Sequence, residues 1–305
     1  MTGPPLKNLA ASVHQRLLNK ARESGRPFNE LLQYYALERF LYRLSRTRHG
    51  DKFVLKGPLM FVVWRAPTTR PTKDIDLLGR IRNDAEMIRA VFSDVCRQDV
   101  EPDGLTFDAE SVQTTEIAED ADYEGVRVRL RGHMGNTRLS LQVDIGFGDA
   151  VSPAAKVIEY PTILESPAPR LHGYSRESTI AEKLHAMVQL ESLNSRMKDF
   201  FDIWFLSRRF DFDGRALAEA IKATFGSRDE EVPALPLAFT PSFGDDPVKS
   251  VQWKAFVRKS RLDGAPQLFS DVVAGIAAFL GPVTLALSNG RAFDRAWKAG
   301  GPWSA

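Results

Sequence analysis

The sequence predicts a mixed α/β fold, with strands concentrated in the first half of the chain and helices in the second. Two observations support this prediction. From Phe53 to Ile145, short apolar runs typical of strands alternate with helical segments, and from about residue 176 apolar side chains recur at helical spacing. The 305 residues are enough for one large domain or for two domains of ordinary size.

The N-terminal segment is predicted to contain two helices, over residues 7–24 and 28–46, separated by a Gly-Arg-Pro sequence. In the second helix apolar side chains recur at near-helical spacing, and Asn29 is placed to cap its start. Residues 1–50 contain nine Lys and Arg against three Glu. A solvated helical surface explains this local excess of positive charge, and a surface that contacts phosphate groups is the alternative.

Residues 53–98 are expected to form two strand-to-helix units. FVLK (53–56) is a short buried-strand candidate, and after Gly57-Pro58 the run LMFVVW continues as an apolar helix, because a first helical turn tolerates proline. Residues 73–78 are predicted to form a second strand that leads into an amphipathic helix over residues 85–98.

Residues 112–148 show the alternation of apolar and polar residues that is typical of strands. Arginines alternate with apolar residues in VRVRLR (126–131), and four apolar residues share one face of LSLQVDI (139–145), so Asp144 is expected on the opposite face. Further helices are predicted over residues 176–193, 198–209, 214–225, 247–260 and 268–287.

Composition excludes some classes of protein. The 41 Lys and Arg nearly balance 39 Asp and Glu, so total charge gives no argument for nucleic-acid binding. One cysteine, Cys96, cannot form an internal disulfide, and the five histidines show no zinc-ligand spacing. The N-terminal residues lack the apolar core of a signal peptide, and the apolar stretch 272–287 is shorter than about 20 residues. We therefore expect a cytoplasmic protein with no membrane partner.

Asp74 and Asp76 are the strongest candidates for a metal site. Two residues apart in a strand, their side chains project from one face with roots about 6 to 7 Å apart. Two carboxylates there repel each other, and a divalent cation such as Mg²⁺ converts that repulsion into binding. Taken alone, an Asp-x-Asp pair on a solvated strand edge is the common alternative.

The surroundings of this pair favour phosphoryl chemistry. Lys56 and Gly57 end a strand just before a helix, and a helix N-terminus presents unpaired N–H groups that can hold phosphate. Asp144 can pair beside the two carboxylates, as a metal ligand or as the acceptor of a hydroxyl proton. Arg70, and the hydroxyl of Thr72, lie next to the pair in sequence; for Arg70 the alternative to triphosphate binding is simple neutralisation of the acids.

Lys183 lies beside an apolar helical stripe, so its stem can pack while its ammonium reaches outward toward a phosphate. A surface ion pair with neighbouring glutamates is the alternative. Asp199 and Asp202 are one turn apart on the next predicted helix, and Asp202 lies among aromatic residues and needs a partner if it is buried. Lys183, Arg196 or Lys198 can provide that partner, and an orienting ion pair and direct catalysis remain equally open for Asp202.

Four segments together resemble one known family. FVLKGPLMFVVW, RPTKDIDLLGR, LQVDIGFGD and TIAEKLHAMVQLESLNSRMKDFFDIWFLSR are similar to the successive motifs of the AbiEii/AbiGii toxin family, a branch of the DNA polymerase β-like nucleotidyltransferases. The resemblance covers about residues 53–209. It implies a nucleotidyltransferase-like mixed sheet with flanking helices (51–172), preceded by a helical segment (1–50) and followed by a helical C-terminal domain (173–305).

The resemblance also implies the site. Gly57 matches the glycine of the phosphate turn, Lys183 the lysine that holds the triphosphate, and Asp199 or Asp202 the acid of the last motif. The expected catalytic residues are Asp74, Asp76, Asp144, Lys183 and Asp202, of which Asp74, Asp76 and Asp144 are also the expected metal ligands. The residues expected to bind the nucleotide are Lys56, Gly57, Arg70, Thr72, Lys183 and Asp199.

The resemblance implies a toxin of a bacterial toxin–antitoxin or phage-defence pair. Such an enzyme would use Mg²⁺, or Mn²⁺ in its place, to transfer a nucleotide from an NTP to an RNA acceptor such as tRNA, and a cognate antitoxin protein would restrain it. Pro58 departs from the family pattern, since it removes a hydroxyl or an N–H from the phosphate turn. A catalytically weak NTP-binding module is therefore the alternative, and a metal-dependent phosphodiesterase with the same acids is a third reading.

Overall fold

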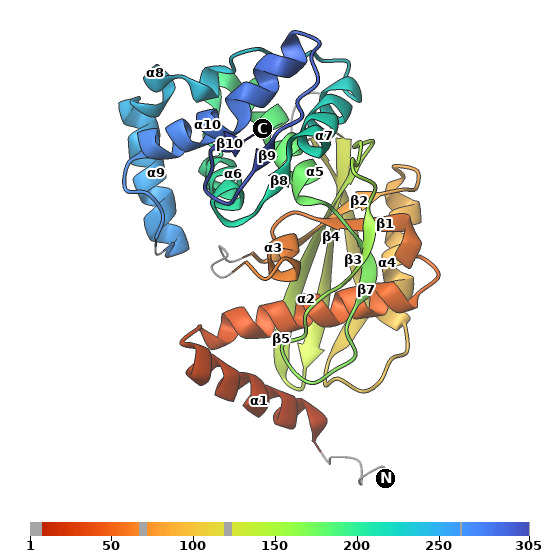
Figure 1. Ribbon diagram of the computed structural model, residues 1–305. Helices are drawn as coiled ribbons and strands as arrows, with labels where there is room; N and C mark the ends of the chain where they lie inside the picture. Colours follow the sequence, from red (N-terminus) through yellow and green to blue (C-terminus); the bar gives the residue numbers. More distant parts are fainter. Residues whose placement is uncertain (1–7, 67–71, 119–123, 263, 305) are drawn as a thin grey trace. The chain divides into compact units, whose positions relative to one another are not determined.

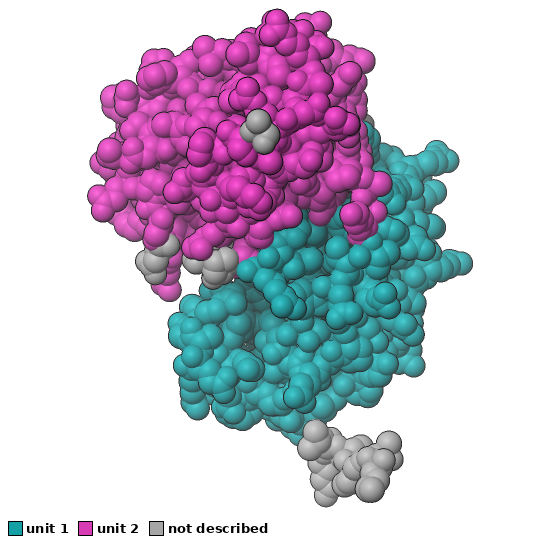
Figure 2. All heavy atoms as spheres, in the orientation of Figure 1, with its two compact units in different colours: residues 1–65, 71–148, 157–173 teal, residues 66–70, 149–156, 174–305 magenta. Residues whose placement is uncertain are grey.

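The computed structural model describes residues 8–66, 72–118, 124–262 and 264–304. The mixed α/β prediction is confirmed: a seven-stranded mixed sheet, a smaller three-stranded sheet and helices make up the described chain (Figure 1). The chain divides into two compact units, shown in separate colours in Figure 2. Unit 1 comprises residues 1–65, 71–148 and 157–173, and unit 2 comprises residues 66–70, 149–156 and 174–305.

The large sheet has the strand order β3-β4-β5-β2-β1-β7-β6. Its strands are β1 (Phe53–Lys56), β2 (Asp74–Gly79), β3 (Thr106–Ala118), β4 (Glu124–Met134), β5 (Thr137–Phe147), β6 (Lys156–Glu159) and β7 (Arg170–Gly173). β2 is antiparallel to β1 and parallel to β5, and β4 is antiparallel to both of its neighbours. The predicted strands at 53–56 and 73–78 are thus confirmed. β6 and β7, each four residues long, were not predicted.

The helices of unit 1 are α1 (Leu9–Ser24), α2 (Phe28–Arg46), α3 (Leu59–Val63) and α4 (Ala85–Arg97). One face of the sheet is apolar, and the rings of Phe40 in α2 and Phe92 in α4 pack there against Phe53 of β1 and Phe107 of β3. The alternation of the strands leaves the polar side chains of β2, β4 and β5 on the opposite face.

The start of α2 differs from the prediction. Pro27 is the residue before the helix, and no side chain caps it, so the expected Asn29 cap is wrong: Asn29 lies inside the first turn. The side chain of Asn8 caps α1: its carboxamide oxygen accepts a hydrogen bond from the Ala11 N–H at 3.0 Å. Gly25 ends α1 in the left-handed conformation, with φ of +68°.

α2 also carries a buried charged cluster. Arg43 donates to both carboxylate oxygens of Asp103, at 2.7 and 3.0 Å, and Arg39 Nε donates to the same carboxylate at 3.1 Å. Glu38 is fully buried beside Arg39, and its carboxylate accepts a hydrogen bond from the Ile163 N–H at 2.7 Å. Burial raises the pKa of Glu38 to about 7, because the neighbouring N–H and guanidinium only partly offset its desolvation. This cluster ties α2 to the loops that flank the sheet.

Unit 2 is mainly helical. Its α-helices are α5 (Arg176–Leu190), α6 (Met197–Arg209), α7 (Gly214–Gly226), α8 (Pro241–Gly244), α9 (Pro247–Ser260) and α10 (Phe269–Ser288), which agree with the predicted helices apart from the short α8. The small sheet, of order β10-β9-β8, was not predicted because its strands are two residues long: β8 (Phe212–Asp213), β9 (Ala296–Trp297) and β10 (Trp303–Ser304).

In the described chain one helix, α10, is long and apolar enough to cross a membrane by composition alone. Its composition has a simpler explanation in packing, since Val272, Ile276, Phe279 and Val283 are fully buried. The Phe279 ring also packs on Trp303, with centroids 5.6 Å apart. α10 is thus a core helix of unit 2.

Candidate active site

The two acids of β2 lie side by side on the polar face of the large sheet. Asp74 and Asp76 are both half-buried, whereas Ile75 and Leu77 between and after them are fully buried on the opposite face. The sequence DIDLL produces this arrangement because successive strand residues point to opposite faces. The side chains of Asp74 and Asp76 therefore share one surface, as predicted.

The neighbouring strand brings Asp144 next to this pair. In the parallel pairing of β2 and β5, Asp76 is opposite Asp144 and Asp74 is opposite Gln142. Directly opposite residues of paired strands project to the same face, and neighbouring strands lie about 4.8 Å apart. The backbone thus places all three acids on one face of two adjacent strands.

The carboxylate of Asp144 is held by an arginine of β4. Arg127 Nε donates to Asp144 Oδ1 at 2.8 Å and Arg127 Nη2 to Oδ2 at 2.9 Å, and Gln142 Nε2 donates to Oδ2 at 3.2 Å. Within the described ranges, no three His, Cys, Asp or Glu side chains are grouped so that they could hold one metal ion. The Arg127 guanidinium balances the charge of Asp144.

Gly57 lies directly against Asp76. It forms the turn between β1 and α3 with φ of +68°, and a Cβ atom there would overlap the Asp76 carboxylate. In the antiparallel pairing of β1 and β2, Lys56 is opposite Asp76, so its side chain projects to the same face as the acids. The predicted helix after Gly57-Pro58 is present, but α3 has only five residues, which weakens the expectation of a helical phosphate cradle.

Thr72 lies at the entrance to β2. Its hydroxyl is 3.4 Å from both the N–H and the carbonyl oxygen of Asp74, and its own N–H donates to the Tyr34 hydroxyl at 3.1 Å. The structure thus places Thr72 beside Asp74, as its sequence neighbourhood suggested. Arg70 lies outside the described residues.

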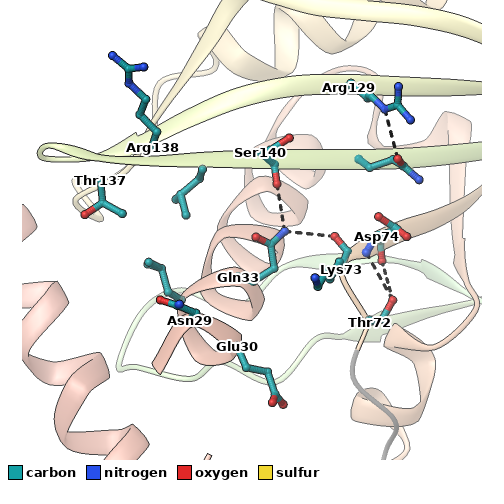
Figure 3. A pocket seen from close by; sticks show the side chains of 13 residues that line it. Asn29, Glu30, Gln33, Thr72, Lys73, Asp74, Arg129, Thr137, Arg138 and Ser140 are labelled. Atoms are coloured by element: carbon teal, nitrogen blue, oxygen red, sulfur yellow. Dashed lines mark hydrogen bonds between the residues drawn. The ribbon is translucent and has the colours of Figure 1, made fainter. Parts of the chain in front are cut away.

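A pocket of about 680 Å³ opens beside Asp74, within unit 1. Figure 3 shows Gln33 of α2 reaching the backbone of two segments: its Nε2 lies 3.2 Å from the Lys73 carbonyl oxygen and 3.3 Å from that of Ser140. The described residues that line the pocket come from α2, β2, β4 and β5 and the segments next to them: Asn29, Glu30, Leu32, Gln33, Thr72, Lys73, Asp74, Arg129, Thr137, Arg138, Leu139, Ser140 and Gln142.

The remaining predicted site residues form a separate cluster in unit 2. Lys183 Nζ of α5 lies 2.6 Å from Asp199 Oδ1 and 2.8 Å from Asp202 Oδ2, and Arg196 Nε donates to Asp199 Oδ2 at 2.7 Å. Burial opposes ionisation of Asp199, but the charges of Lys183 and Arg196 outweigh it and hold its pKa below the usual range. The ion pair that the sequence left open for Lys183 and Asp202 is present.

Two residues near the acids of unit 1, Arg127 and Gln33, were assigned differently or missed. The arginines at 127, 129 and 131 were interpreted chiefly as a solvated strand face, yet Arg127 is the direct partner of Asp144. The missing information was strand register, because alternation predicts the face of each residue but not the residue opposite it. Gln33 gave no signal, since its contacts are to backbone atoms far away in sequence.

A family model described as nucleotidyl transferase AbiEii toxin, type IV toxin–antitoxin system, matches residues 39–294. Among solved structures, that of JHP933 from Helicobacter pylori is similar with a TM-score of 0.46 and 16% sequence identity, over 93% of this chain and 94% of that one. A second H. pylori protein, named for an inferred nucleotidyltransferase activity, has a TM-score of 0.43 and 15% identity, over 93% of this chain and 97% of its own. No curated protein matches the sequence.

Proposed function

The chain belongs to the AbiEii family of nucleotidyltransferase toxins of type IV toxin–antitoxin systems, and we propose that it transfers a nucleoside monophosphate from an NTP to an RNA acceptor such as tRNA. Family membership makes it a nucleotidyltransferase and implies an NTP substrate and an antitoxin partner. The RNA acceptor and the dependence on Mg²⁺ are part of our proposal.

One observation carries the proposal: the pairing of β2 with β5 and of β2 with β1. It gathers Asp74, Asp76, Asp144 and Lys56 on one face, with Gly57 packed against Asp76. Carboxylates next to a glycine turn and a lysine are the groups that metal-bound triphosphate requires.

The residues of β2 fit a divalent cation. Mg²⁺ is commonly held by one or two carboxylates together with substrate phosphates, and Asp74 and Asp76 supply two half-buried carboxylates on one face. Mn²⁺ accepts the same oxygen ligands. When bound, the ion would neutralise the developing charge on the phosphates and lower the pKa of an attacking hydroxyl. These two aspartates are sufficient for that role without a third acid.

In the proposed reaction the acceptor hydroxyl oxygen forms a bond to the α-phosphorus of the NTP. The bond from that phosphorus to the bridging oxygen breaks, so pyrophosphate leaves and the hydroxyl proton passes to a base. Asp144 is the third acid of the proposal, as a ligand or as the proton acceptor. Either role requires its carboxylate to exchange the Arg127 guanidinium for the ion or the hydroxyl.

For unit 2 we propose that Lys183 binds the phosphates of the NTP. Asp199 and Asp202 orient its ammonium, and Asp202 also acts as the family's last acid. The support is the short contacts of Lys183 to both carboxylates, which fix the position of an otherwise flexible side chain. We further propose that the enzyme acts in the cytoplasm as a growth inhibitor in phage defence, under the control of its antitoxin.

The test is transfer of label to RNA. Purified protein is incubated with Mg²⁺, total bacterial RNA and each of the four α-labelled NTPs, and labelled RNA is separated by size. We expect extended RNA with the wild type and with the exposed-residue control Asp99→Ala, and no labelled RNA with Asp74→Asn or after chelation of the metal. Nucleotide binding without transfer, or shortened RNA, would contradict the proposal.

The same assay decides the role of Asp144. If Asp144 is a ligand or base, Asp144→Asn abolishes transfer as completely as Asp74→Asn does. The matched change Arg127→Met removes its ion-pair partner but keeps the carboxylate, so transfer should survive. Full activity of Asp144→Asn would remove Asp144 from the proposal while leaving Asp74 and Asp76 in place.

A further inference from the structure

The polar face of the large sheet continues from the three acids along β4 and β5. In the antiparallel pairing of these strands, Arg129 is opposite Gln142, Arg131 is opposite Ser140 and His133 is opposite Arg138. All of these side chains project to the face that carries Asp74, since Gln142 is also opposite Asp74. From Asp144 to Arg138 this face extends about 20 Å along β5, at about 3.3 Å per residue.

We call Arg129, Arg131 and Arg138 the arginine strip. All three are exposed, and they lie on strands that are held in one register by the β4–β5 pairing. Alternate residues of a strand are about 7 Å apart, so Arg129 and Arg131 present cations at regular intervals along β4. On the apolar face of the same strands, Val128, Leu130 and Leu141 are buried.

Two of the three arginines of the strip, Arg129 and Arg138, form no ion pair with a carboxylate of the described chain. Arg129 has one long hydrogen bond, 3.4 Å to Gln142 Oε1, and within the described chain neither Arg138 nor the nearby Lys73 has a carboxylate within 4 Å. Arg131 is two-thirds exposed and pairs with Asp108 at 3.0 Å, a pair that solvent weakens. This differs from Arg127, whose guanidinium donates two hydrogen bonds to the carboxylate of Asp144.

The pocket beside Asp74 runs along the strip. Arg129, Arg138 and Lys73 line it, and of its two carboxylates that of Glu30 is neutralised by Arg26 at 2.6 Å. The other is Asp74, one of the two proposed metal ligands. The pocket's volume of about 680 Å³ is in the range of pockets that hold small ligands. The pocket thus offers cations and hydroxyl donors next to the reacting end.

From this arrangement we propose that the arginine strip and the pocket bind the acceptor, as the phosphate backbone of a single-stranded RNA end. This inference rests on the proposed function and deepens it. The face from Asp144 to Arg138 is about as long as six stacked nucleotides at about 3.4 Å each. It leads to Asp74 and Asp76, where one terminal hydroxyl must arrive, so a strand end fits better than the middle of a duplex. Contacts to phosphates make binding tolerant of sequence and sensitive to salt.

The experiment compares two double variants of equal charge change. Arg129→Ala/Arg138→Ala removes two cations from the strip. Arg89→Ala/Arg97→Ala removes two exposed arginines of α4, the helix that covers the apolar face. Each protein is titrated with a fluorescent 12-nucleotide single-stranded RNA at several salt concentrations, with Mg²⁺ and a fluorescent ATP analogue, and in the transfer assay.

The strip variant is expected to bind the RNA at least about tenfold more weakly than the wild type. Its salt slope should fall by about 1.4, or 0.7 for each lost phosphate contact on a single strand. Binding of the ATP analogue should not change, and transfer should fall through the KM for RNA. The α4 variant should behave as the wild type in every assay, which separates loss of a site from loss of net charge.

Two results would overturn the inference: an RNA affinity and salt slope of the strip variant equal to those of the wild type, or an equal loss in the α4 variant. Either can occur while the wild type still transfers nucleotides, in which case the proposed function stands. Conversely, a wild type that binds RNA through the strip but labels no RNA refutes the proposed function and leaves the binding surface supported.

Discussion

Replacing Gly57 by alanine tests the close packing between the β1–α3 turn and Asp76. The backbone of Gly57 has φ of +68°, where an L-residue with a Cβ costs about 1 kcal/mol. The added Cβ would also overlap the Asp76 carboxylate, which then has to move. Overpacking of this kind costs about 1 to 3 kcal/mol, so we expect Gly57→Ala to lower the free energy of unfolding by about 2 to 4 kcal/mol.

The chain offers a matched control at Gly25. Its φ is also +68°, but a Cβ there meets no atom within 4 Å. Gly25→Ala should therefore lose only the backbone cost of about 1 kcal/mol. The difference between the two variants, measured by urea denaturation, isolates the contact with Asp76.

The functional consequence separates the two variants more sharply. Displacement of Asp76 should weaken binding of Mg²⁺-NTP by more than about tenfold in Gly57→Ala, which corresponds to a loss of about 1.4 kcal/mol or more of binding free energy, and leave it unchanged in Gly25→Ala. Titration with a fluorescent NTP analogue measures this. Equal losses of stability in both variants, together with equal NTP affinity, would refute the reasoning.

Three further predictions concern buried ionisable groups. The pKa of Glu38 is raised from 4.5 to about 7, so its contribution to the free energy of unfolding is complete below pH 4.5 and is lost as the pH rises through 7. This loss amounts to about 3 kcal/mol. Glu38→Gln should flatten it, as measured by urea unfolding at pH 5 and pH 8. The pKa of Asp199 is lowered, so its contribution to the free energy of unfolding is present above the usual aspartate pKa and is lost on acidification. Asp199→Asn should lower the free energy of unfolding by about 3 kcal/mol at pH 7, as followed by thermal unfolding. An unchanged unfolding midpoint would contradict the buried ion pair with Lys183. Burial raises the pKa of the Cys96 thiol to about 12, so at pH 8 the native protein should resist iodoacetamide while the urea-unfolded protein reacts, and rapid native labelling would show that Cys96 is accessible.

The candidate site was predictable to the extent that it depends on local pattern. The DIDLL sequence alone places Asp74 and Asp76 on one face of a strand, because alternation is a property of each strand by itself. The pairing of Asp144 with Arg127 was not predictable, because the two residues are 17 apart and meet through the register of the β4–β5 hairpin. Strand alternation says which face a side chain occupies, and only the assembled sheet says which residue is opposite it.

Other differences have equally local causes. Asn29 has the right chemistry for a helix cap, but Pro27 already fixes an extended backbone before the helix, which begins at Phe28 and so includes Asn29. The strands of the small sheet are two residues long, which is too short for any periodic signal.

The parallel pairing of β5 with β2 makes the site sensitive to the length of β5. Deletion of one residue between Thr137 and Asp144 would turn Asp144 toward the hydrophobic interior and bring an aliphatic neighbour out beside Asp76. Deletion of two residues would keep an acid on the outer surface but move it one step along. Sequence changes in this strand should therefore be tolerated among relatives as substitutions, or in pairs, and rarely as single insertions or deletions.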